Sequence, residues 1–139
     1  MNKPQPDYRR LVAAAKNRRP ERIPLYEHII DDSVMEAVLD EEFAEALDSD
    51  PAEYFQHYVE FFRTCGYDTV SFECLITEVL PGAGALYRHT PGCIGNREDF
   101  ERYPWDEVAD RFFERYRGRF EALRAVMPEG MKAVGGPGN

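Results

Sequence analysis

The stretch over residues 66–74 is the feature that most constrains the fold of this chain. It runs Gly-Tyr-Asp-Thr-Val-Ser-Phe-Glu-Cys, and its β-branched and aromatic residues are typical of a strand. Its apolar residues Val70, Phe72 and Cys74 alternate with polar ones, so the two kinds point to opposite faces. Such a strand lies either between a helix layer and solvent or in a barrel with a polar interior. The segments on either side favour the barrel.

Helix and strand patterns alternate along the rest of the chain. A strong amphipathic helix precedes the strand: Asp50 is its predicted cap, Pro51 its first residue, and Gly66 ends it. Further helices are predicted over about residues 7–16, 31–39, 96–103 and 104–127, and further strands over residues 23–28 and 131–134. Alternation of this kind predicts parallel strands joined by helical crossovers.

The predicted fold class is α/β, as a partial (β/α)8 barrel made of the first three strands with their helices. A full barrel of this type takes about 250 residues, whereas the chain has 139. We therefore expect residues 1–139 to form the N-terminal portion of such a domain. The alternative is a complete small α/β domain with a three-stranded parallel sheet.

Composition limits the partners and the compartment. The net charge of −9 argues against nucleic acid and anionic membrane surfaces, both of which need clustered Lys and Arg. No apolar run approaches the roughly 20 residues of a membrane span. The three cysteines, Cys65, Cys74 and Cys93, show no C-x-x-C spacing and cannot all be paired with one another. We expect a cytoplasmic protein that binds a small molecule, and neither nucleic acid nor membrane.

Two glutamates are the candidate catalytic residues. The chemistry of a (β/α)8 barrel lies at the carboxyl ends of its strands, where Glu73 and Glu27 are predicted. Two carboxylates at one barrel mouth raise each other's pKa, so that one can act as a general acid. They would alternatively bind a cationic or hydroxyl-rich substrate, or hold the backbone amides of neighbouring loops.

Candidate substrate-binding residues occur beside these strand ends and in a long loop over residues 76–96. Long loops inside compact domains are often functional, although an exposed loop tip explains the same residues. The glycines after the last strand would let a substrate approach the backbone. The candidates are His28, Arg88, His89, Gly135, Gly136 and Asn139. No metal site is predicted, because the spacings of the cysteines and histidines fit no known set of ligands.

Several segments, taken together, resemble the uroporphyrinogen decarboxylase superfamily, which also contains the corrinoid-dependent methyltransferases. They are residues 11–24, with Arg-Pro-Glu-Arg-Ile-Pro, residues 62–68 followed by Val-Leu-Pro at 79–81, and residues 96–105, with Asn-Arg-Glu-Asp-Phe and Tyr-Pro-Trp. The resemblance covers the N-terminal part of the family's domain and implies a (β/α)8 barrel.

The resemblance also implies a site and a reaction. The family's catalytic aspartate follows the second strand in a Phe-Ser-Asp context, and Glu73 stands near that place. True decarboxylases carry an arginine-rich run after the first strand, which holds the acidic groups of the tetrapyrrole. Here residues 27–31 carry negative charge instead. Methyl transfer from a small methylated substrate is therefore the leading expectation, and tetrapyrrole decarboxylation is the alternative.

Cofactors and partners follow from the same resemblance. The methyltransferases hold zinc through residues in the second half of the barrel, so we expect no cofactor bound by these residues, and zinc and a corrinoid protein for the parent enzyme. A further alternative is a non-catalytic partial barrel with an open sheet edge. Such a chain would form a homodimer or associate with the other half of the barrel.

Overall fold

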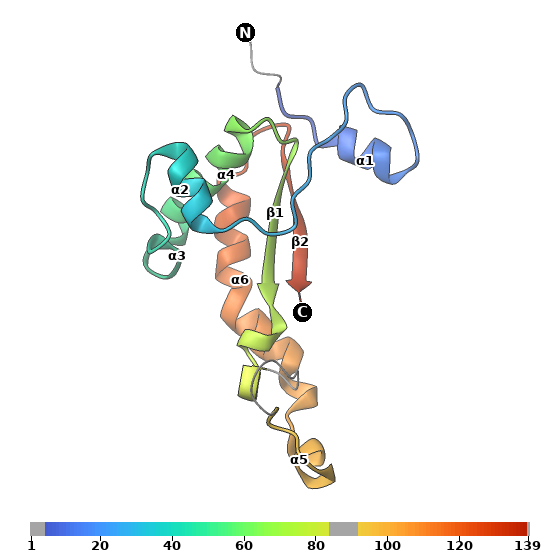
Figure 1. The fold of residues 1–139 in the computed structure, drawn as a ribbon, viewed down its shortest axis with the longest axis vertical. Helices are drawn as coiled ribbons and strands as arrows, with labels where there is room; N and C mark the ends of the chain where they lie inside the picture. Colours follow the sequence, from blue (N-terminus) through green and yellow to red (C-terminus); the bar gives the residue numbers. More distant parts are fainter. Residues whose placement is uncertain (1–4, 84–91, 139) are drawn as a thin grey trace. The chain divides into compact units, whose positions relative to one another are not determined.

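The computed structural model describes residues 5–83 and 92–138 (Figure 1). The α-helices are α1 (Arg9–Ala15), α2 (Asp32–Leu39), α3 (Ala46–Ser49), α4 (Pro51–Thr64), α5 (Arg97–Arg102) and α6 (Val108–Val126). Three short 3-10 helices are η1 (Ile76–Glu78), η2 (Pro81–Ala83) and η3 (Trp105–Glu107). The strands are β1 (Thr69–Leu75) and β2 (Lys132–Gly138).

The chain divides into two compact units. The first unit contains residues 1–72 and 119–135, and the second contains residues 73–118 and 136–139. The division therefore passes through β1, β2 and α6. Each unit is described by itself below.

The strands β1 and β2 pair in a small parallel sheet. Both were predicted from the sequence, and their existence is confirmed. The glycine-rich end of the chain was predicted as a loop, which is wrong as far as Gly138: Gly135 and Gly136 lie inside β2.

The strand predicted over residues 23–28 is wrong. These residues form neither helix nor strand, so the described part of the chain has two strands where three were predicted. Pro24 has no N–H to donate to a ladder. The side chain of Ile23 is 84% exposed and that of Leu25 is 44% exposed, so no sheet face buries them in the way a strand of the core requires. The described structure is a mixture of helices with a small parallel sheet.

Helix α4 begins and ends as its sequence predicts. The side chain of Asp50 accepts a hydrogen bond from the N–H of Glu53 at 3.1 Å, and Pro51 is the first helical residue. Gly66 follows the helix with a φ of 83°, which a residue with a Cβ rarely adopts. The side chains of Asp31 and Asn96 cap α2 and α5 by accepting hydrogen bonds from backbone N–H groups.

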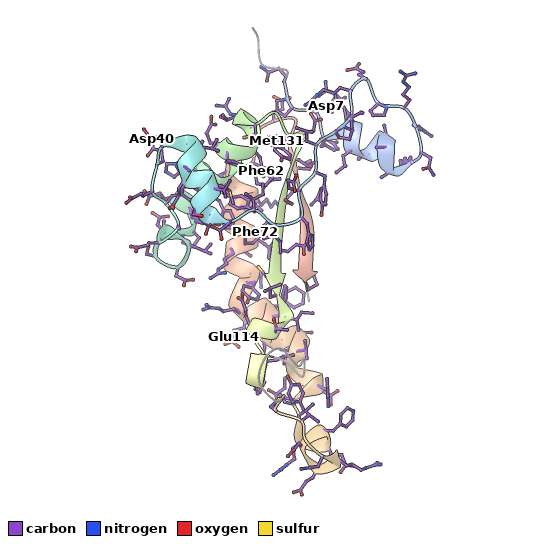
Figure 2. All side chains as sticks on the ribbon, in the orientation of Figure 1. Asp7, Asp40, Phe62, Phe72, Glu114 and Met131 are labelled. Carbon is purple, nitrogen blue, oxygen red and sulfur yellow. The ribbon has the colours of Figure 1, made fainter. Side chains whose placement is uncertain are left out.

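The core of the first unit forms where β1 meets the aromatic face of α4 (Figure 2). The ring of Phe72 lies 4.8 Å from that of Phe55 and 5.9 Å from that of Tyr58, edge to face in both cases. Phe120 of α6 contacts the same ring at 5.5 Å. Each such pair adds about 0.5–1.5 kcal/mol beyond the area it buries. The apolar face of β1 therefore packs on helices.

The polar face of β1 is buried as well. Thr69 and Ser71 are each 3% exposed. The backbone oxygen of Ser71 accepts a hydrogen bond from the hydroxyl of Tyr58 at 2.7 Å. The alternation seen in the sequence thus marks a strand covered on both faces, rather than one with a solvated side.

Gly135 has a structural reason to be glycine. A Cβ placed on it would lie 1.9 Å from the backbone oxygen of Phe72, and its φ is 151°. Its neighbour Gly136 has a φ of 155°, but a Cβ there would meet no atom within 4 Å. The two glycines share the same backbone requirement, and only the first is also required by a close approach.

We predict that Gly135→Ala destabilises the protein more than Gly136→Ala. Both substitutions strain the backbone by about 1–3 kcal/mol, and Gly135→Ala adds a clash worth a further 1–3 kcal/mol or so. Urea unfolding followed by circular dichroism measures the difference in the free energy of unfolding. Equal losses for the two variants would contradict the close approach of β2 to β1.

Candidate functional site

Glu73 lies near the carboxyl end of β1, as predicted. Its side chain is partly buried in the second unit. A Cβ built on Gly138 would lie 3.0 Å from its carboxylate oxygen Oε2, so this oxygen lies against the end of β2. A side chain at position 138 would therefore crowd this carboxylate.

A second carboxylate and a phenol lie directly after β1 in the same unit. Tyr116 of α6 is fully buried, and its hydroxyl donates a hydrogen bond of 2.6 Å to Oε2 of Glu78. The same hydroxyl lies 3.4 Å from the backbone oxygen of Leu75. Nothing in the sequence indicated this contact, because Glu78 and Tyr116 are 38 residues apart.

An open pocket of about 380 Å³ adjoins Glu78 in the second unit. Its lining combines two carboxylates, two guanidinium groups and one apolar side chain. These are Glu78, Val79, Arg111, Glu114 and Arg115. Charges of both signs suit a small polar ligand better than an apolar one.

The other predicted catalytic residue, Glu27, lies in the first unit and is exposed, as is His28. Burial raises the pKa of Tyr67, and the negative charge of Glu27 raises it further. Glu27 therefore lies within electrostatic reach of the residue that comes two positions before β1. Because Glu27 and Glu73 belong to different units, their meeting at one barrel mouth stays a prediction.

The remaining candidates have mixed outcomes. Gly135 is needed for the close approach of the two strands, and Gly136 has open space beside it. Arg88, His89 and Asn139 lie outside the described residues. Neither Gly135 nor Gly136 lies against Glu73, and their role in substrate binding stays a prediction.

A buried ion cluster that sequence reasoning missed lies just before the amino end of β1. Asp68 is fully buried, and its Oδ1 accepts hydrogen bonds from Arg10 at 2.9 Å and from Arg22 at 2.7 Å. The backbone N–H of Asp7 donates a third, at 2.9 Å. The hydrogen bond to Asp68 raises the pKa of Arg10 above its ordinary value. The available signal was an acidic residue next to a buried strand, in a chain with several arginines near its start.

This cluster is not fully satisfied. Oδ2 of Asp68 and Nε of Arg22 are buried and have no hydrogen-bond partner among the described residues. Arg22 also donates to the backbone oxygen of Gly66 at 3.0 Å. The contacts of Asp68 join residues before, within and after α1 to the residue that precedes β1.

Two general properties bear on the site. Within residues 5–83 and 92–138, no three His, Cys, Asp or Glu side chains are grouped so that they could hold a metal ion. None of the described helices combines the length and the apolar character needed to cross a membrane.

No protein-family model, curated protein or solved structure matches this chain. The resemblance to the uroporphyrinogen decarboxylase superfamily therefore stays a prediction from the sequence segments.

We predict that Asp68→Asn destabilises the protein by about 3–5 kcal/mol, because it leaves two arginines beside a buried site without their counter-charge. The matched control is Glu101→Gln, which removes the exposed ion pair with Arg97 and costs less than about 1 kcal/mol. Urea unfolding of both variants measures the two losses. Similar small losses would show that the Asp68 cluster does not hold the first unit together.

Proposed function

We propose that this chain forms the first part of a (β/α)8 barrel enzyme of the uroporphyrinogen decarboxylase and corrinoid methyltransferase superfamily, and that the enzyme transfers a methyl group from a small methylated substrate. The observation that carries the proposal is the parallel pairing of β1 and β2, with Glu73 near the carboxyl end of β1. Parallel strands require a crossover connection, and here α5 and α6 lie in that connection.

Glu73 is the residue to which we assign the acid–base role. It stands near the position of the family's catalytic aspartate, and its partial burial keeps it reachable from solvent. A carboxylate in such a place can deliver a proton to a leaving group or accept one from an attacking group. Glu78, with the hydroxyl of Tyr116 bound to it, supplies a second carboxylate in the same unit.

Charge favours methyl transfer over tetrapyrrole decarboxylation. Glu27 and Asp31 are exposed in the segment where the decarboxylases carry arginines. A substrate with many carboxylates would meet like charge there, and two like charges about 4 Å apart repel by roughly 1–4 kcal/mol near a protein surface. A small neutral or cationic methylated substrate meets no such penalty.

The expected cofactors have no ligand set in the described residues. A zinc ion would activate a thiol acceptor and a corrinoid would carry the methyl group, but no cluster of three ligands occurs within residues 5–83 and 92–138. The part of the reaction assigned to these residues is proton transfer at Glu73.

The non-catalytic partial barrel remains the second candidate. The exposed apolar side chains of Ile23 and Ile29 favour it, because such side chains are ordinarily covered by a partner.

The test uses the polypeptide as its own cells make it, isolated through a tag added at the N-terminus of the chromosomal gene. We expect methyl transfer between methylcobalamin and a thiol, read from the corrinoid absorbance. Glu73→Gln should lower the rate by at least about 100-fold, as expected for the loss of a general acid or base. The control Glu41→Gln removes an exposed carboxylate outside the site and should leave the rate unchanged.

Other results have definite meanings. Release of carbon dioxide from uroporphyrinogen without methyl transfer would establish the decarboxylase alternative. Methyl transfer that is unaffected by Glu73→Gln would remove Glu73 from the reaction. If neither activity is found, the non-catalytic partial barrel is the better account.

A further inference from the structure

The segment over residues 23–30 connects α1 and α2 (Figure 1). Several of its large apolar side chains are exposed. Ile23 is 84% exposed, Ile29 is 64% exposed and Leu25 is 44% exposed. Residues 23–27 make no backbone-to-backbone hydrogen bond with another described residue. Residues 23–27 therefore have both apolar side chains and backbone groups available for pairing.

The order of residues in this segment suits an edge strand. In an extended chain Ile23, Leu25 and Ile29 share one face, because side chains alternate with a period of two. The N–H and C=O groups of these odd-numbered residues also point to one edge. Pro24 is even-numbered, so its missing N–H faces the other edge and does not interrupt pairing along the first.

The charges toward the two ends of the segment are opposite in sign. Residues 16–22 carry a net positive charge, with Lys16, Arg18 and Arg19 exposed. Residues 27–32 carry a net negative charge, with Glu27 and Asp31 exposed. A segment that is basic at one end and acidic at the other is complementary to a second copy of itself in the antiparallel direction.

We propose that residues 23–29 of two copies of this chain pair as antiparallel strands about a two-fold axis near Tyr26, and so form a homodimer. Ile23 of one copy then lies opposite Ile29 of the other, and each basic flank lies beside the acidic flank of the partner copy. The contact is short compared with the interfaces of stable dimers, so the dimer is weak and depends on concentration. It is independent of the methyl-transfer proposal.

The first test measures association of the whole chain by sedimentation equilibrium across the micromolar to millimolar range. We expect a monomer–dimer equilibrium for the native chain. Ile29→Ser should raise the dissociation constant at least about ten-fold, as the loss of a buried anchor does. The control Phe113→Ser removes an equally exposed apolar side chain from α6 and should leave the constant unchanged. A native chain that stays monomeric, or equal effects of the two variants, would overturn the proposal.

The second test reverses the charge of one flank in each of two variants. One variant carries Arg18→Glu and Arg19→Glu, which makes both flanks acidic. The other carries Glu27→Lys, Asp31→Asn and Ser33→Lys, which makes both flanks basic while asparagine keeps the cap of α2. Each variant alone should be monomeric, and an equimolar mixture should form a heterodimer. Failure of the mixture to associate, with both variants folded by circular dichroism, would overturn the antiparallel arrangement.

Discussion

The buried carboxylate of Asp68 accepts hydrogen bonds from two arginines and a backbone amide, all at one oxygen. Removing a carboxylate from water costs several kcal/mol unless its partners are close and well directed. The partners come from three places near the start of the chain: Asp7 lies before α1, Arg10 lies in it, and Arg22 follows it. Because α1 has no buried residue, apolar packing contributes little to its position. The carboxylate of Asp68 thus links Asp7, Arg10 and Arg22 to the start of β1.

Contacts of different kinds lie along β1. Near its amino end lies the Asp68 cluster, and its middle packs Phe72 against the aromatic face of α4. Toward its carboxyl end it presents Glu73, followed by Glu78 with its bond from Tyr116. The Asp68 cluster belongs to the first unit and Glu73 to the second.

Local signals in the sequence predicted much of the fold. Asp50, Pro51 and Gly66 delimit α4, and Asn96 caps α5, because caps and helix-ending glycines act within a few residues. The strand over residues 23–28 failed, since a strand exists only where a partner pairs with it, and alternation of side chains does not supply that partner. The glycines of β2 were taken for a loop because glycine is rare in strands, but Gly135 is required there by its contact with Phe72.

The site was less predictable than the fold. Glu73 could be placed near a strand end because the pattern around it was strong. The side-chain hydrogen bonds of Asp68 and Glu78 join residues that are far apart in the sequence. Asp68 bonds to Arg10 across 58 residues, and Glu78 bonds to Tyr116 across 38. No spacing rule in the sequence reports such pairs, because they depend on how separate elements pack.

Amide hydrogen exchange, followed by mass spectrometry on the native chain, tests the central role of Asp68 most directly. A seven-residue helix is barely stable in water by itself. If Asp68 holds α1 to the start of β1, the amides of α1 should be protected to within about ten-fold of those of β1. Exchange of α1 at the rate of an unstructured peptide, with β1 still protected, would show that the buried carboxylate does not hold the start of the chain in place.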